Sequence, residues 1–189
     1  MATGDIYPNG DNGTNQWTAI GCTLHHDCID EDKGSPSMSD NIGAIQPGGQ
    51  DNFVEDFDMG SITITEATSV TVYAYGYGGA TYGGDAEVDF YDGNSWQGYQ
   101  NLGLPIGVTP EWRNKTFGSL SMNQTALDNC RVRFRADIGA SKQSVVIGAV
   151  YAVVTFSSGW SHKFNGVANS DIAKINGVSI SDIAKVQGV

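Results

Sequence analysis

The segment "RVRFRA", residues 131–136, alternates arginine with apolar residues at every position. Successive side chains of a β-strand point to opposite faces, so this pattern predicts a strand with Val132, Phe134 and Ala136 buried and the arginines outward. "SVTVYAYGY" (69–77) sets small and branched apolar residues against three tyrosines, and "AEVDFYDG" (86–93) alternates up to an Asp-Gly turn signal. "SVVIGAVYAVVTF" (144–156) is apolar on both faces, which predicts a strand in the centre of a sheet.

Weaker strand patterns and one helical pattern complete the chain. The weaker strands are "QWTAIGCT" (16–23), "DNIGAI" (40–45), "DNFVEDFDM" (51–59), "SITIT" (61–65) and "NKTFGSL" (114–120); only "MNQTALDN" (122–129) indicates a helical turn. Seven to nine short strands without long helices predict an all-β fold, an antiparallel β-sandwich of jelly-roll-like type. We expect this body to cover residues 1–157 and a C-terminal arm to cover residues 158–189.

Charge excludes two classes of partner. The formal net charge is −11, with only 10 Lys and Arg residues among 189. Nucleic-acid binding needs clustered Lys and Arg, and an anionic membrane surface would repel such a chain. No segment is apolar and long enough to span a bilayer, and "MATGDIYPNG" has no basic and apolar leader. If Met1 is the native start, we expect synthesis in a cytosol.

The three cysteines, Cys22, Cys28 and Cys130, are too few and odd in number for a disulfide framework. Cys22 and Cys28 could pair with each other, and any of the three could bond between subunits. Free buried thiols are the plainer interpretation.

The segment "CTLHHDCIDED" (22–32) gathers potential metal ligands. Its Cys22, His25, His26 and Cys28 have a spacing that matches no common zinc module, and four ligands so close together would strain tetrahedral geometry. The alternate carboxylates Asp27, Asp30 and Asp32 would instead suit calcium. We expect neither metal, and no cofactor.

No catalytic motif is present in the sequence. There is no G-x-S-x-G elbow and no H-E-x-x-H, and the run "YGYGGATYGG" lacks the Lys-Ser/Thr of a P-loop. A carboxylate pair for glycoside hydrolysis can come from distant positions, so the many Asp and Glu residues do not indicate one. We therefore expect a protein that is not an enzyme.

Two exposed strand faces have alternative uses. The arginine face of residues 131–135 predicts cross-strand pairing with Glu87 and Asp89, and an ion-pair belt between subunits is the alternative. A set of tyrosines with one tryptophan could form an aromatic platform for stacking sugars, although packing of these rings against the other sheet or another subunit is the plainer interpretation. That set is Tyr73, Tyr75, Tyr77, Tyr82 and Trp96, with Tyr99 nearby.

The C-terminal arm contains an eleven-residue repeat. "FNGVANSDIAK" (164–174) is followed by "INGVSISDIAK" (175–185) and a truncated "VQGV", with turn-forming Asn-Gly pairs at 165–166 and 176–177. So few units cannot bury their apolar side chains against one another, so we expect the arm to oligomerise or anchor on another chain. Folding back onto the body is the alternative. The apolar positions are Phe164, Val167, Ile172, Ile175, Val178, Ile183, Val186 and Val189.

The tail segment "AKINGVSISDIAKVQGV", with the opening "YPNGDNGTNQWT" and the closing "IGAVYAVVTF", resembles bacteriophage structural proteins. The resemblance implies a virion component made in the host cytoplasm, a homotrimer that contacts other virion proteins. Within that class we favour a capsid decoration (cement) protein, because such proteins hold neighbouring capsomers with an extended arm. A neck or tail fibre, or a receptor-binding carbohydrate-binding module that recognises a host-surface glycan, is the alternative.

Overall fold

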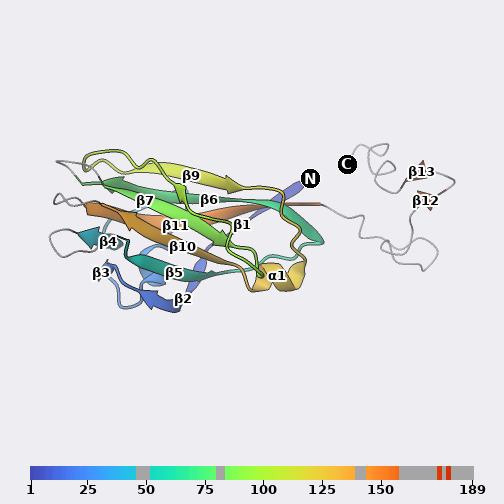
Figure 1. Ribbon diagram of the computed structural model, residues 1–189, viewed down its shortest axis with the longest axis horizontal. Helices are drawn as coiled ribbons and strands as arrows, with labels where there is room; N and C mark the ends of the chain where they lie inside the picture. Colours follow the sequence, from blue (N-terminus) through green and yellow to red (C-terminus); the bar gives the residue numbers. More distant parts are fainter. Residues whose placement is uncertain (46–51, 80–83, 139–143, 158–173, 176–177, 180–189) are drawn as a thin grey trace.

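The computed structural model describes residues 1–45, 52–79, 84–138, 144–157, 174–175 and 178–179 of the chain. These residues form two antiparallel sheets packed face to face (Figure 1). The all-β sandwich predicted from strand periodicity is therefore confirmed.

The first sheet has the order β3-β4-β11-β6-β9, and β1 pairs with the second half of β11. Its strands are β1 (Ala2–Ile6), β3 (Thr18–Ile20), β4 (Asn41–Ile45), β6 (Glu66–Gly78), β9 (Glu111–Phe117) and β11 (Ser144–Ser157). The second sheet has the order β2-β5-β10-β7-β8. Its strands are β2 (Pro8–Asn15), β5 (Val54–Met59), β7 (Asp85–Tyr91), β8 (Gln100–Asn101) and β10 (Arg131–Asp137).

The strand order is that of a jelly roll. From β4 to β11, successive strands alternate between the sheets, apart from β7 and β8, and give the orders β4-β11-β6-β9 and β5-β10-β7-β8. Two four-stranded antiparallel sheets connected in this way make the jelly roll that the sequence predicts. Strand β11 is the central strand of its sheet, as its two apolar faces predict, and it pairs with β4 and β1 along one side and with β6 along the other.

The core lies between the sheets and follows from period-two alternation. On β6 the residues at 70, 72 and 74 are buried, and on β10 the residues at 132, 134 and 136 are buried. Rings from the second sheet meet in the core: Phe57 and Phe134 lie edge to face with centroids 6.5 Å apart. Burying such side chains supplies about 1.5–3 kcal/mol each before the cost of ordering them.

In the described part of the chain, two short helices and one pair of short strands do not belong to either sheet of the sandwich. The helices are the 3-10 turn η1 (His26–Cys28) and α1 (Gln124–Asp128), which falls inside the helical segment predicted at 122–129. Strands β12 (Lys174–Ile175) and β13 (Val178–Ser179) pair antiparallel, with Ile175 opposite Val178. Among the described residues, no helix has the length and hydropathy needed to cross a membrane.

The predicted strand at 61–65 is wrong. This segment runs between β5 and β6 without a ladder partner, although Ile64 still packs into the core. The side chain of Gln124 replaces that partner: its Oε1 accepts from the amide of Ile64 at 2.8 Å, and its Nε2 donates to the carbonyl of Ile62 at 3.0 Å. The alternation of "SITIT" thus reflects packing of an irregular segment against α1.

Candidate functional site

Three arginines form a row along the outer face of β10, each paired with a carboxylate of a neighbouring strand. Arg133 donates to Asp89 at 2.8 Å, and Arg135 donates through Nε to Glu87 at 2.6 Å. The predicted cross-strand pairing with these two carboxylates is confirmed. The third arginine, Arg131, donates to Asp56 of β5 at 3.1 Å.

Aromatic rings from β7 and the loop that follows it lie over this row. The Arg133 guanidinium lies 3.8 Å from the ring centroid of Trp96, and the Arg135 guanidinium lies 4.1 Å from that of Tyr99. Arg131 lies 4.6 Å from the centroid of Tyr91. Guanidinium groups stack favourably on aromatic faces, so the row and the rings hold one another in place.

The loop that carries Trp96 is fixed by carboxylates. Asp92 Oδ1 accepts from the amides of Asn94 and Ser95, both at 2.8 Å, and Asp89 Oδ1 accepts from the amide of Gly98 at 2.7 Å. Gly93 has a φ of +87°, and a Cβ there would approach the backbone of Ala126 within 2.5 Å. Glycine therefore lets this loop pack closely against α1.

A pocket of about 590 Å³ opens at the end of the arginine row, and we call it the polar pocket. It lies where β2, the ends of β5 and β7, the start of β10 and the end of α1 meet. Polar side chains and one tyrosine make up most of its lining, which consists of Asn9, Asn12, Asp58, Met59, Tyr91, Gly93, Asp128, Asn129 and Arg131.

The polar groups of the pocket are held by hydrogen bonds. Arg131 donates to Asn12 Oδ1 at 3.0 Å, and Asn12 in turn donates to Asp58. Asp128 accepts from Ser61 at 2.5 Å and from Gln124 at 2.7 Å. These two hydrogen bonds lower the pKa of Asp128, and the one from Ser61 has the larger effect. Asp128 is therefore a carboxylate at neutral pH.

The tyrosines predicted as a sugar platform lie on the other side of the sandwich from the polar pocket. Tyr73, Tyr75 and Tyr77 are half-buried on the outer face of β6, in the first sheet, whereas Trp96 follows β7 in the second. Tyr82 lies outside the described residues. The structure therefore does not bring the predicted set together.

The β6 tyrosines use their ring faces on one another and on their neighbours. Tyr73 and Tyr151 of β11 are stacked, with centroids 4.6 Å apart and planes 5° apart. This separation is close to the spacing between strands, so the faces of these rings point along the sheet and their edges point outward. Tyr75 meets Trp112 of β9 at 5.3 Å. This arrangement favours packing over a flat platform for a sugar ring.

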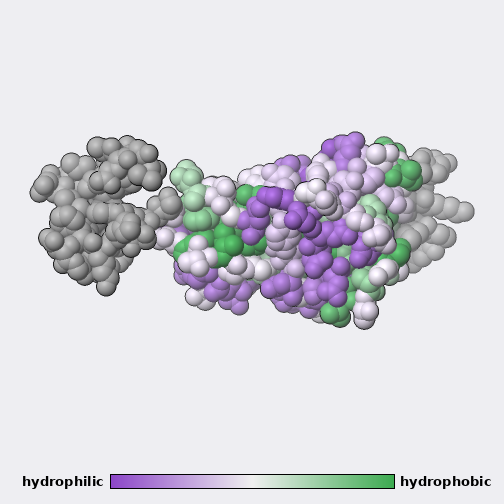
Figure 2. All heavy atoms as spheres, turned by 180° about the vertical axis from the view of Figure 1, so that it is seen from behind, coloured by the Kyte–Doolittle hydropathy of each residue, from purple (hydrophilic) through white to green (hydrophobic). Residues whose placement is uncertain are grey.

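Figure 2 shows the molecule from behind the view of Figure 1. Hydrophilic residues cover much of the middle of this face, and hydrophobic residues gather toward its two ends. Large contiguous apolar patches mark protein-binding surfaces, and the middle of this face does not form one.

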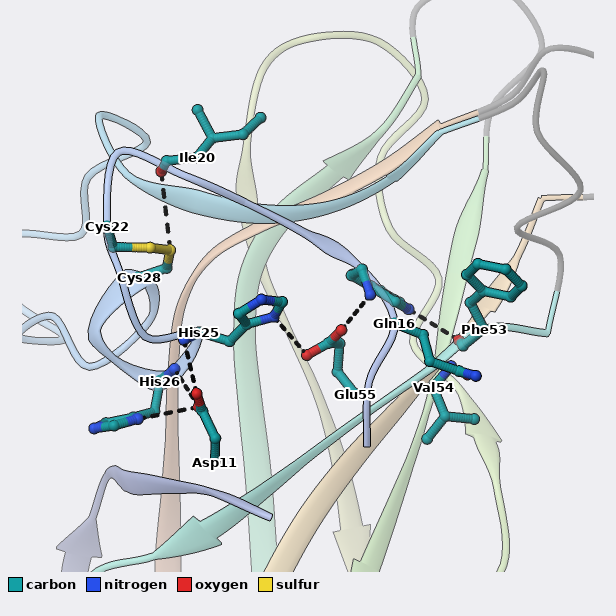
Figure 3. Close-up of polar contacts among 11 residues, drawn as sticks. Asp11, Gln16, Ile20, Cys22, His25, His26, Cys28, Phe53, Val54 and Glu55 are labelled. Atoms are coloured by element: carbon teal, nitrogen blue, oxygen red, sulfur yellow. Dashed lines mark hydrogen bonds and ion pairs between the residues drawn. A yellow bond between two sulfur atoms is a disulfide. The ribbon is translucent and has the colours of Figure 1, made fainter. Parts of the chain in front are cut away.

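The cysteine and histidine segment is a structural cluster (Figure 3). Cys22 and Cys28 form a disulfide, with Cα atoms 5.5 Å apart, and Cys130 is free and buried. Free thiols, the plainer interpretation from sequence, are therefore wrong for two of the three cysteines. The pairing takes both sulfurs away from any metal. In the described part of the chain, no group of three or more His, Cys, Asp or Glu side chains could hold a metal ion.

The two histidines bind carboxylates of the second sheet. His25 Nδ1 lies 2.9 Å from Oε2 of the buried Glu55, and His26 Nδ1 lies 3.0 Å from Oδ1 of Asp11 (Figure 3). Burial raises the pKa of Glu55 in spite of hydrogen bonds from the amide of Trp17 and from His25. Burial also opposes ionisation of Asp11, but hydrogen bonds from both histidines outweigh it and lower its pKa. The cluster fixes the segment around η1 to β2 and β5.

Most of the predicted oligomerisation residues lie outside the described residues. These are Phe164, Val167, Ile172, Ile183, Val186 and Val189. Ile175 and Val178 belong to the β12–β13 hairpin. The oligomerising arm and the division of the chain at residue 157 stay predictions.

Sequence reasoning missed the polar pocket. Its residues come from four separate stretches of the chain, 9–12, 58–59, 91–93 and 128–131, and each of them looks like an ordinary turn or strand end in the sequence. The one available signal was polar residues following alternating strands, as in "FYDGNSW" (90–96), and that signal is shared by most surface turns.

The sequence matches no known protein family and no curated protein. Among solved structures, the chain is similar to the CBM36-1 domain of a multidomain xylanase from the hindgut metagenome of Trinervitermes trinervoides. The identity is 9%, 83% of this chain and 99% of that chain are covered, and the TM-score is 0.45.

The chain is also similar to the C-terminal CBM6 of LamC from Zobellia galactanivorans, at 11% identity, covering 82% and 100% of the two chains, with a TM-score of 0.40. A third similar structure is TmCBM61 in complex with β-1,4-galactotriose, at 11% identity, covering 74% and 88%, with a TM-score of 0.37. All three are carbohydrate-binding module domains by name. At these identities and scores, the likeness carries no argument about what this chain binds.

Proposed function

We propose that this chain is a non-catalytic carbohydrate-binding module and that the polar pocket holds a sugar unit of its ligand. The observation that carries the proposal is an aromatic wall, Tyr91, beside hydrogen-bonding side chains that are already fixed in one open pocket. This proposal replaces the capsid decoration protein as the leading function.

The chemistry of the lining suits a polyol. Sugar hydroxyls both donate and accept hydrogen bonds, and the carboxylates, amides and guanidinium of the pocket offer both kinds of partner. Arg131 and Trp96 lie against the Tyr91 ring, so the C–H groups of a pyranose would pack against the part of the ring that these neighbours leave open to the pocket. A volume of about 590 Å³ falls within the range of small-molecule sites.

Preorganisation supports binding at this site. Arg131 is held by Asn12, by Asp56 and by the ring of Tyr91, so its position is set before a ligand arrives. A fixed side chain loses little rotational freedom when it binds, which leaves more of the interaction energy as affinity.

The carboxylates favour binding over glycoside hydrolysis. A general acid in that reaction needs a raised pKa so that it carries a proton at neutral pH. The pKa of Asp128 is instead lowered by its hydrogen bonds from Ser61 and Gln124. Glu55 has a raised pKa, but its carboxylate is buried beneath Trp17 and His25 and does not line the pocket.

The test is binding of neutral oligosaccharides, chosen on a glycan array and measured by isothermal titration calorimetry. We expect Tyr91→Ala to weaken binding at least about tenfold, which corresponds to about 1.4 kcal/mol. Tyr91→Phe keeps the ring and should stay near the wild type. Tyr75→Ala, on the other sheet, is the matched control and should bind normally.

Two results would contradict the proposal. Wild-type protein that binds no glycan on the array would exclude the function itself. Binding that survives Tyr91→Ala but is lost in Tyr75→Ala would move the site to the tyrosines of β6, and so exclude the polar pocket.

A second candidate function is a bacteriophage virion structural protein that assembles through its C-terminal arm. The feature that favours it is the repeat in residues 164–189, in which β12 and β13 pair as a short hairpin. The two candidates are compatible, since a virion protein can also bind a glycan of the host surface.

Removal of residues 164–189 tests this second candidate. We expect full-length protein to be oligomeric and the truncated protein to be a folded monomer, because the truncation removes the apolar side chains that would hold the subunits together. Light scattering coupled to size exclusion gives both masses, and circular dichroism checks the fold of the truncated chain. An unchanged oligomeric mass after truncation would contradict an oligomerising arm.

A further inference from the structure

Resting on the proposed function, we infer that the polar pocket takes uncharged sugar units and excludes glycans that carry carboxylate or sulfate groups. The inference depends on the balance of charges that line the pocket and lie directly behind it.

Acidic groups outnumber basic ones at this site. Asp58 and Asp128 line the pocket, and Asp56 lies behind Arg131 at 3.1 Å. Among the described residues of the lining, Arg131 is the one cationic side chain. The charge of Arg131 is balanced by Asp56. Arg131 therefore does not neutralise Asp58 and Asp128, the two carboxylates of the lining.

The other two arginines of the row are also paired with carboxylates. Arg133 is paired with Asp89 at 2.8 Å, and Arg135 is paired with Glu87. Each of these guanidinium groups is also covered by an aromatic ring, Trp96 over Arg133 and Tyr99 over Arg135. Neither arginine is therefore placed to neutralise an acidic ligand in the pocket.

The carboxylates can still serve an uncharged sugar. Asp58 accepts one hydrogen bond from Asn12, and Asp128 accepts two at the same oxygen, Oδ1, which leaves other lone pairs for sugar hydroxyls. A carboxylate that accepts from a hydroxyl forms a charge-assisted hydrogen bond. The same group facing a uronate or a sulfate ester would repel it, and the formal net charge of −11 adds to that repulsion.

The experiment compares matched ligands that differ in charge. The neutral probes are cellohexaose, mannohexaose and laminarihexaose. The tightest of them is then compared with the same hexasaccharide after oxidation of its C6 hydroxyls to carboxylates, and with the methyl ester of that product. We expect the carboxylate form to bind at least about tenfold more weakly at about 0.05 M NaCl, and the gap to narrow at about 0.5 M, where the charges are screened. The methyl ester should recover most of the lost affinity.

Two variants assign the exclusion to the pocket. Asp128→Asn and Asp58→Asn each remove one negative charge and keep an acceptor oxygen, so each should improve binding of the carboxylate form several-fold relative to the neutral one. Asp32→Asn removes the same charge from an exposed loop outside the pocket and should leave that ratio unchanged.

The outcomes separate this inference from the proposed function. Binding of the neutral and carboxylate forms with equal affinity, unmoved by salt or by Asp128→Asn, would overturn the inference and leave the binding function standing. Failure to bind any of the hexasaccharides or any glycan on the array would overturn the proposed function, and the inference with it.

Discussion

Asp89 and Arg133 show how single residues handle charge on the second sheet. The carboxylate of Asp89 is fully buried on β7, where its ionised form would be costly by several kcal/mol without partners. It accepts from Arg133, from the amide of Gly98 and from its own neighbour Phe90. One buried carboxylate thus fixes both the arginine row and the loop that carries Trp96.

Cys130 is the free thiol of a chain whose other two cysteines are paired. Burial raises the pKa of its thiol to about 12, so the nucleophilic thiolate is scarce at neutral pH. We expect iodoacetamide at about pH 8 to label no cysteine in the folded protein, one after denaturation, and three after denaturation with reduction. Mass spectrometry counts the labels. A thiol labelled in the folded state, or two or more labelled in the unreduced denatured chain, would contradict this arrangement.

At the scale of elements, η1 and the loop around it are held to β2 and β5 by two imidazole–carboxylate contacts with opposite pH dependence. Burial raises the pKa of Glu55, so its ionised form costs stability at neutral pH, and this cost disappears as the pH falls through that raised pKa toward the ordinary 4.5. The pKa of Asp11 is lowered, so its contribution is present above its ordinary 3.8 and is lost as the pH falls below that value.

The free energy of unfolding of Glu55→Gln at pH 7 should therefore equal that of the wild type or exceed it by up to about 1 kcal/mol. The amide oxygen of glutamine can still accept from the Trp17 amide, and its NH₂ can donate to His25. The advantage should shrink as the pH is lowered toward 4.5. Urea unfolding at several pH values measures it, with Asp11→Asn as the control that loses stability at pH 7. A Glu55→Gln protein that is several kcal/mol less stable at pH 7 would show that the ionised carboxylate stabilises the fold.

The strands whose two faces differ were predictable from the sequence. β6, β7 and β10 alternate because one face is buried and the other is not, and β11 is apolar throughout because it is central in its sheet. β2 has the sequence "PNGDNGTN", which has Thr14 as its single β-branched residue and resembles a turn, yet it pairs with β5 through irregular register. Its pairing is set by the neighbouring sheet and by contacts such as Asn12 with Asp58, which local pattern does not reveal.

At the scale of the whole molecule, the jelly roll places the ends of distant strands together. Strands β2, β5, β10 and β7 are consecutive neighbours in one sheet. One pocket at the ends of these strands therefore collects residues 9 and 12 of β2, residue 91 of β7 and residue 131 of β10. No spacing along the chain marks such a site, so the sequence predicted the fold class but not the pocket. The described members of the aromatic set that the sequence singled out are divided between the two sheets.

Chemical-shift mapping is the most direct test of sugar binding at the polar pocket. The isotope-labelled protein, at 20.1 kDa, is titrated with the tightest neutral hexasaccharide while its amide resonances are followed. We predict that the amides of Tyr91, Gly93 and Asn129 shift in proportion to occupancy, while those of Tyr73 and Tyr75 on the other sheet stay in place. Shifts confined to β6 and β9, or no shifts at saturating sugar, would contradict sugar binding at the polar pocket.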